Sequence, residues 1–401
     1  MVQRRIPLTV YQPSKPGVHS FAILASFEAA ARSILISVFP VLLLRGLENA
    51  EGVSEVYLMA GVVSLIIAFA TPFIAQYVAR RWLYTAGCLG MINGNILALV
   101  SGPEWLGLVL IANAASLVVM TICFNAYVMD FIERTSLGKN ESTRLLYSGA
   151  AWAIGPALGV WLMDISPNIP FFVSIVACFC LLGFFWYLRM GDGKVIVKAR
   201  RPTQNPLSYI FRFLKQKPLV AGWLFASIRS VGWWVYIVYL PVFAINNGLG
   251  DKLGGTALSI SNAFLFTAPL MLRYIVSKNV RLSIVLGFGA SGILFIVAAL
   301  SNFMPVVTIV ALVAATVFLV LLDVCAGLPF LMLVKPSERT EMATVYSTYR
   351  DVSSVATPGI ARLILIFSPV TGIFLVCGLG LLACAAVALK LPKRLGEKRH
   401  R

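Results

Sequence analysis

The first apolar run of the chain, 21–44, sets the strongest constraint on the fold. It reads FAILASFEAAARSILISVFPVLLL and is 24 residues long. A helix rises 1.5 Å per residue, so a run of this length can cross the hydrocarbon core of a bilayer, which is about 30 Å thick. The run nevertheless contains Glu28 and Arg32. Charges inside a bilayer are costly, so both side chains are expected to face a cavity or to pair.

The composition extends this conclusion to the whole chain. Hydrophobic residues make up 59% of the 401 residues and charged residues only 12%, whereas a soluble domain carries about 25% charge. The mean hydropathy is +0.87. A lipid bilayer is therefore the expected surroundings for most of the chain. With two histidines and no phosphate-binding loop, we expect no cofactor, no metal and no enzymatic activity.

Twelve apolar spans are predicted, and their loops carry an asymmetric charge. With the N-terminus in the cytoplasm, 27 of the 33 Lys and Arg residues fall on cytoplasmic segments and two on outer loops. This bias is the positive-inside pattern of membrane proteins, and it accounts for the net charge of +17 without a nucleic acid partner. The spans are 20–44, 55–79, 82–100, 105–131, 144–164, 169–189, 218–245, 255–276, 282–300, 305–333, 343–366 and 369–389.

The second half of the chain repeats the first at a nearly constant offset. In each pair of matching segments the second lies in the equivalent span of the other half, and Glu28 is matched by Arg229. This pattern indicates two six-span bundles in the same orientation, related by an axis along the membrane normal. The matches are Ala25-Ser26-Phe27-Glu28 with Ala226-Ser227-Ile228-Arg229, Phe39-Pro40-Val41 with Leu240-Pro241-Val242, and Tyr147 with Tyr349.

One long polar break divides the two predicted bundles. We expect an N-terminal bundle at 1–189, a basic cytoplasmic linker at 190–217 and a C-terminal bundle with a basic tail at 218–401. Within the linker, LSYIFRFLKQK places its apolar residues on one helix face and its cations mostly off that face. A short helix on the cytoplasmic membrane surface fits this pattern, and a plain linker with chance periodicity is the alternative.

Taken together, the chain resembles the major facilitator superfamily over essentially its whole length. Twelve spans in two sets of six, a long central loop and both termini inside are the features that carry the resemblance. The family's loop between spans 2 and 3 is degenerate here. Arg80 and Arg81 match its basic pair, whereas Gln76 and Tyr77 replace its acid and arginine. The resemblance therefore implies a cytoplasmic gate at this loop in which Gln76 and Tyr77 supply a polar or aromatic contact.

A second motif lies in span 5. Gly155-Pro156-x-x-Gly159 resembles the span-5 motif of the family's proton-coupled exporters. Proline bends a helix because it lacks an N–H, and glycine permits the close approach of a neighbour. Simple helix packing is the alternative explanation of this run.

Two charges at equivalent depths form the main functional hypothesis. In the family's architecture, spans 1 and 7 line the central cavity on opposite sides. Glu28 is then expected to face Arg229 across the translocation path, and protonation of Glu28 would break their attraction. The alternative is local, because Arg32 lies one turn from Glu28 and could neutralise it within the same helix.

Further polar groups are predicted in the second half. Asp323 lies inside span 10, while Arg350 and Asp351 lie in span 11. A pair of Asp323 with Arg350, and a second proton site at Asp323, are both expected, with a purely structural pair as the alternative.

The substrate side of the hypothesis rests on span 7 and on the charge balance. Trp233 and Tyr236 share the helix face of Arg229 and could stack on an organic substrate. Four arginines inside spans oppose three carboxylates, which favours an anionic or zwitterionic substrate. Arg32 and Arg229 are the predicted anion-binding residues.

The sequence thus predicts a secondary active transporter of a small organic molecule, coupled to protons and favouring export. An importer or facilitator of an organic anion is the alternative of the same class. A transporter-derived receptor or a lipid-handling protein without ion coupling is the alternative of another class. We expect a bacterial inner (plasma) membrane, cytoplasmic termini and a monomer as a sufficient unit.

Overall fold

The protein is an all-helical bundle, seen here in a computed structural model that describes residues 16–132, 137–188, 206–271, 273, 279–334, 342 and 345–392. These described residues contain no strand. Eleven of the helices are long and apolar enough to cross a membrane. The predicted span 343–366, the eleventh in chain order, contains α16, which has 17 residues, so the count of twelve remains a prediction.

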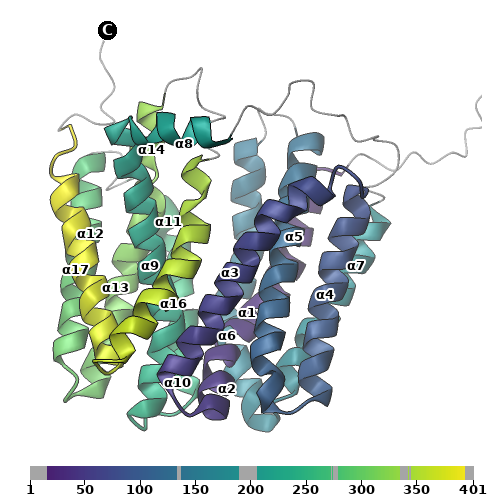
Figure 1. Ribbon diagram of the computed structural model, residues 1–401, viewed down its shortest axis with the longest axis horizontal. Helices are drawn as coiled ribbons and strands as arrows, with labels where there is room; N and C mark the ends of the chain where they lie inside the picture. The colour runs from purple at the N-terminus through teal and green to yellow at the C-terminus, as the bar shows by residue number, and fades with distance from the viewer. Residues whose placement is uncertain are drawn as a thin grey trace, which may run out of the picture.

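The helices fall into two groups that lie side by side (Figure 1). The N-terminal half consists of α1 (Val18–Ile36), α2 (Val38–Leu47), α3 (Ala50–Ile74), α4 (Arg80–Val100), η1 (Pro103–Trp105), α5 (Leu106–Phe131), α6 (Leu137–Ile165) and α7 (Ile169–Tyr187). The C-terminal half consists of α8 (Pro206–Leu214), α9 (Lys217–Asn246), α10 (Lys252–Ala263), η3 (Phe264–Thr267), α11 (Ala268–Met271), α12 (Val280–Leu300), α13 (Pro305–Cys325), α14 (Leu328–Leu333), α16 (Tyr349–Leu365) and α17 (Val370–Ala388).

Proline and asparagine explain several helix boundaries. A turn at Ser37 separates α1 from α2. Pro40 has no N–H to bond the carbonyl four residues earlier, which belongs to Ile36, the last residue of α1. The two helices together form one candidate span. Asn49 caps α3 by accepting from the N–H of Gly52, and Asn279 caps α12 by accepting from the N–H of Leu282 at 2.9 Å. Such caps satisfy amides that have no partner inside the helix.

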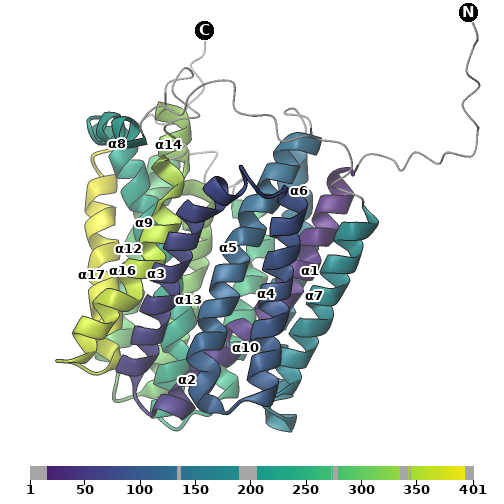
Figure 2. The ribbon, with the colours of Figure 1, turned by 45° about the vertical axis from the view of Figure 1, so that its right-hand side comes forward.

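The start of α1 and the end of α17 lie at the same end of the bundle, which we call the terminal end (Figure 2). One hydrogen bond marks this end in each half. His19 at the start of α1 is hydrogen-bonded to Tyr147 of α6, and Arg281 at the start of α12 donates to the carbonyl of Leu389 after α17. The opposite end, where α2 meets α9, is called the far end.

The two halves pack together mainly through two helix pairs, with a smaller contact between α2 and α9. α6 packs on α10, and α3 packs on α16. The largest buried core is continuous across the halves toward the far end, where it joins Leu43 and Tyr57 to Tyr239 and Phe243. Toward the terminal end each half has its own cluster, around Phe21 in the N-terminal half and around Phe213 in the C-terminal half. Packing between the halves is therefore concentrated away from the terminal end.

Candidate functional site

A charged cluster of the N-terminal half lies in the middle of α1. Arg32 Nη1 is 3.3 Å from Glu28 Oε1, one helical turn away. The Arg32 guanidinium also lies over the ring of Trp152 on α6, 5.3 Å from the ring centroid. Glu28 is mostly buried, and Arg32 is 35% exposed. The pair is thus neutralised within one helix, with an aromatic surface beside the cation.

A second charged cluster lies in the C-terminal half, between α9 and α13. Arg229 Nε is 3.2 Å from Asp323 Oδ1. Trp233, one turn after Arg229, donates from its indole Nε1 to Asp323 Oδ2 at 3.0 Å. The two carboxylate oxygens of Asp323 therefore have different partners. Its side chain is 30% exposed, so the protein does not enclose this carboxylate completely.

Tyr349 of α16 connects this cluster to a third arginine. Its hydroxyl accepts from Arg229 Nη2 at 3.2 Å and from Arg350 Nε at 3.0 Å. Both guanidinium groups also lie over its ring, at 5.5 Å and 5.6 Å from the centroid. Arg350 is exposed and forms no ion pair with any carboxylate of the described residues. It is the cation of this cluster that has no counter-ion in contact.

These contacts differ from the predicted pairing. Glu28 pairs with Arg32 on the same helix, which is the alternative pairing considered in the sequence analysis, rather than with Arg229. Asp323 pairs with Arg229 rather than with Arg350. The described part of the chain contains no ion pair between Glu28 and Arg229. The reason is geometric, because each carboxylate finds an arginine in its own half.

Tyr236 occupies a different environment from Trp233. It is 1% exposed, and its hydroxyl is hydrogen-bonded to Ser261 of α10 at 2.6 Å. Its ring packs edge-on against Trp233 with centroids 6.2 Å apart. In this conformation Tyr236 has no free surface for a substrate, and it supports the indole that binds Asp323.

The Gly155-Pro156-x-x-Gly159 run packs α6 tightly against α1. A Cβ atom on Gly155 would overlap Ser33, and one on Gly159 would overlap the backbone oxygen of Ile34. Both positions are buried. The glycines thus permit the closest approach of α6 to α1, beside the helix that carries Glu28 and Arg32.

Pro156 acts on the opposite side of α6, toward the C-terminal half. Proline has no N–H for the carbonyl four residues earlier, which here belongs to Trp152. The side-chain amide of Asn262 on α10 donates to this oxygen at 2.9 Å. Next to the proline, the N–H of Ala157 donates to Ser259 Oγ at 2.8 Å. These backbone groups on either side of Pro156 are therefore satisfied by the other half.

The degenerate loop before α4 retains one charged contact. Arg80 Nη1 is 2.8 Å from Asp130 Oδ2 at the end of α5, and its guanidinium lies over Tyr127. Arg81 lies over the ring of its neighbour Trp82. Gln76 and Tyr77 are exposed and form no hydrogen bond with another described side chain. In this conformation neither of them closes a gate.

Charged residues bridge the two halves at the far end. Arg45 of α2 pairs with Asp251, and Lys252 pairs with Asp164 of α6. Arg362 of α16 reaches two carboxylates of α3, with Oε1 of Glu51 at 3.7 Å and Oε2 of Glu55 at 3.4 Å. Arg362 therefore belongs to the far end and is not part of either charged cluster.

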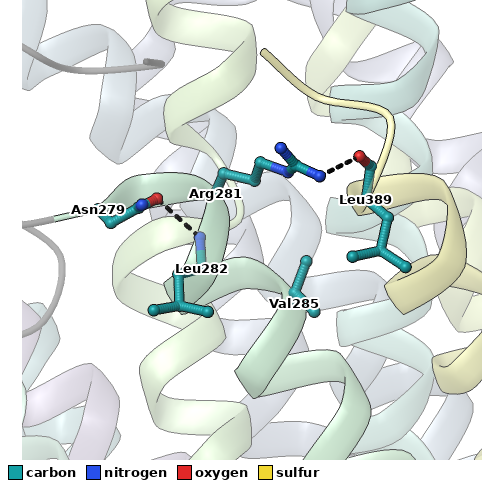
Figure 3. A pocket seen from close by; sticks show the side chains of 5 residues that line it. All are labelled: Asn279, Arg281, Leu282, Val285 and Leu389. Atoms are coloured by element: carbon teal, nitrogen blue, oxygen red, sulfur yellow. Dashed lines mark hydrogen bonds between the residues drawn. The ribbon is translucent and has the colours of Figure 1, made fainter. Parts of the chain in front are cut away.

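The remaining predicted group and the surface cavities lie apart from these clusters. Asp351 is partly exposed and forms no ion pair within the described ranges. A cavity of about 250 Å³ opens at the terminal end between α12 and α17, beside Arg281 and Leu389 (Figure 3). Nowhere in the described chain do three His, Cys, Asp or Glu side chains gather as metal ligands would.

Two aromatic residues of the site were not predicted to belong to it. Tyr349 had been noted only as the repeat partner of Tyr147, although its position next to Arg350 inside a span was a usable signal. Trp152 carries no such signal, because its role depends on the approach of α6 to α1. Both rings supply the surfaces against which the arginines lie.

The family is shown by a model of the Major Facilitator Superfamily, which matches residues 21–358. The chain therefore belongs to the Major Facilitator Superfamily and is an integral membrane protein. No curated protein matches the sequence.

Solved structures share the fold at low sequence identity. A peptide transporter POT in complex with sulfate has a TM-score of 0.75 and 12% identity, with 95% of each chain covered. A POT family transporter in complex with 5-aminolevulinic acid has a TM-score of 0.74 and 13% identity, covering 96% of this chain and 99% of that one. The nucleoside transporter NupG has a TM-score of 0.69 and 12% identity, with 94% and 99% covered.

Proposed function

We propose that the protein is a proton-coupled secondary active transporter that moves a small organic molecule by alternating access. The two moving bodies are the six-span bundles of the N-terminal and C-terminal halves, 1–189 and 218–401. The observation that carries the proposal is the pair of charged clusters inside the spans, one in each half. Intramembrane charges of this kind mark substrate and ion pathways.

The distribution of contacts between the halves supports alternating access. Ion pairs and a continuous core hold the far end together, whereas the clusters near the terminal end belong to each half separately. The positive-inside count assigns the terminal end to the cytoplasm. This conformation would then be open toward the cytoplasm, and rupture of the far-end ion pairs would accompany the opposite state.

Glu28 is the proposed proton-coupling residue, with Asp323 as the second site. Among the described residues, Glu28 has one cationic partner, Arg32, whereas Asp323 is held by both Arg229 and Trp233. Protonation of Glu28 would remove one ion pair only. It would also release Arg32, whose guanidinium already lies against Trp152, to bind a group on the substrate.

Export is the proposed direction, and it rests on the resemblance of the Gly155-Pro156-x-x-Gly159 run to that of proton-coupled exporters. The proposed location is the inner (plasma) membrane of a bacterium. A monomer contains both charged clusters and both bundles, so it suffices for this mechanism.

Uptake of an organic anion is the second candidate, and the contacts of Arg350 favour it. This exposed arginine is bound to the Tyr349 hydroxyl and to no carboxylate of the described chain. A carboxylate or phosphate on the substrate would supply the missing counter-ion. Entry of protons together with such an anion would drive uptake rather than export.

One flux experiment separates these functions. Purified protein is reconstituted into vesicles that contain a pH-sensitive dye, and amphiphilic drugs and organic anions are added with a pH gradient imposed in either direction. The proposal predicts substrate movement opposite to the proton flux. Movement with the protons indicates anion uptake, and ligand binding without any flux would instead indicate a receptor or lipid-handling protein.

A further inference from the structure

The helix α8 has an apolar face that no part of the described protein covers. Figure 1 shows α8 lying across the terminal end, crosswise to the long axes of the spans. Ile210, Phe211 and Leu214 are 41%, 66% and 57% exposed. Positions three and four apart share a helix face, so these three side chains form one continuous apolar surface.

The orientation of α8 is fixed from its other side. Phe213 is 2% exposed and packs with Leu219, Phe330 and Val334, the ring centroids of Phe213 and Phe330 being 6.5 Å apart. In helical projection Phe211 lies about 160° from Phe213 and Leu214 about 100° from it, whereas Ile210, three positions earlier, lies only about 60° away. The packing of Phe213 therefore fixes the rotation of α8 with Phe211 and Leu214 turned away from the packed side. The exposed surface is therefore held outward by packing rather than free to turn inward.

Cationic side chains border this surface. Lys215 follows Leu214 by one position and Lys217 begins α9, and both are exposed without an ion-pair partner in the described chain. A helix with an apolar face, a flanking cationic face and an anchor on a membrane bundle has the features of an interfacial helix. Acidic headgroups attract basic residues placed next to a membrane.

We propose that α8 is a lipid-binding element: Ile210, Phe211 and Leu214 insert among the acyl chains at the terminal end, and Lys215 and Lys217 bind acidic phospholipid headgroups. The occupant is the bilayer itself, because α8 packs on α9 and leads into it within three residues, and α9 is a candidate membrane span. The inference concerns a lipid site and is independent of the transported substrate.

Site-directed spin labelling of the full chain tests the proposal. Six of the seven cysteines are buried and Cys180 is exposed, so Cys180→Ser provides a background with little competing labelling. Leu214→Cys and Lys215→Cys are labelled in this background. The protein is reconstituted in phosphatidylcholine vesicles, with or without a quarter of the lipid replaced by phosphatidylglycerol. Collision with oxygen, which concentrates in lipid, is compared with collision with a water-soluble nickel chelate.

The expected result is a severalfold higher oxygen-to-nickel ratio at Leu214 than at Lys215, and a further increase at Leu214 when phosphatidylglycerol is present. The added increase should disappear at high salt, which screens exposed charges, and also when Leu214→Cys is combined with Lys217→Gln. A label on Asn302, an exposed residue of the far end, gives the water reference. Equal oxygen-to-nickel ratios at Leu214 and Lys215 would overturn insertion. A ratio at Leu214 that does not change when phosphatidylglycerol is added would overturn headgroup binding.

Discussion

The side-chain amide of Asn262 crosses the boundary between the two halves and donates to the backbone oxygen of Trp152 at 2.9 Å. This oxygen is the one that Pro156 leaves without a helical donor. The proline of α6 and its partner on α10 thus act together. A contact of this kind holds the two halves in register at mid-height, between the ion pairs of the far end and the separate clusters of the terminal end.

The first prediction concerns this hydrogen bond. Asn262→Leu should destabilise the protein by about 1 kcal/mol, because the partly buried carbonyl of Trp152 loses its donor. The measurement is thermal unfolding in detergent. Asn302→Leu, the same change at an exposed position, should have little effect.

A double-mutant cycle sharpens this test. Pro156→Ala restores an N–H that can bond Trp152 within α6, so Asn262→Leu should cost less in that background than in wild type. Equal costs in both backgrounds would show that the proline and the asparagine act independently.

The second prediction concerns the glycines of α6. Gly159→Ala should destabilise the protein by about 1–3 kcal/mol, because its Cβ would overlap the backbone of Ile34 and force α1 away from α6. Gly183→Ala on α7 is the matched control, since its Cβ would meet nothing within 4 Å. Thermal unfolding of both variants is compared, and equal unfolding temperatures would refute the packing argument.

The third prediction concerns Arg229 and Asp323. Arg229→Gln should destabilise the protein by about 1–3 kcal/mol, since it leaves a carboxylate inside the membrane without its cation; this is below the cost of breaking a fully buried pair, because Asp323 is 30% exposed. Adding Asp323→Asn should recover part of the loss. At the more exposed pair of Arg80 and Asp130, Arg80→Gln should cost less than about 1 kcal/mol.

The fourth prediction concerns the far end. Arg362→Gln combined with Lys252→Gln should increase the population in which the far end is open, because two of the charged bridges between the halves are removed. Spin labels at Asn168 and Asn302, exposed positions at the far end of the two halves, report the change as a longer distance in pulsed electron paramagnetic resonance. An unchanged distance distribution would mean that packing alone closes this end.

The sequence predicted the helical membrane fold because apolar length and charge asymmetry are local properties of the chain. In the described part of the chain, eleven helical segments are long and apolar enough to cross a membrane. The resemblance to the Major Facilitator Superfamily is confirmed. α16 was less clear because Tyr349, Arg350 and Asp351 make its beginning polar. In the structure α16 begins after a turn at Thr348 and has 17 residues.

The sequence was less informative about the site, because pairing depends on how helices rotate about their axes. Glu28 and Arg229 occupy equivalent positions of the repeat, yet each has a closer partner, Arg32 and Asp323 respectively. Depth in the membrane could be counted from the sequence, but the direction of a side chain could not. Trp152 illustrates the limit, since no local pattern places it under the Arg32 guanidinium.

The central claim, that a carboxylate of the charged clusters couples transport to protons, is tested most directly by Glu28→Gln in vesicles with an imposed pH gradient. For a substrate moved by the wild-type protein, the account predicts that the variant loses acceleration by the gradient and still exchanges labelled for unlabelled substrate. Glutamine keeps the shape of the side chain but cannot carry the proton. If the variant responds to the gradient as the wild type does, Glu28 is only the structural partner of Arg32, and the claim for this residue is wrong.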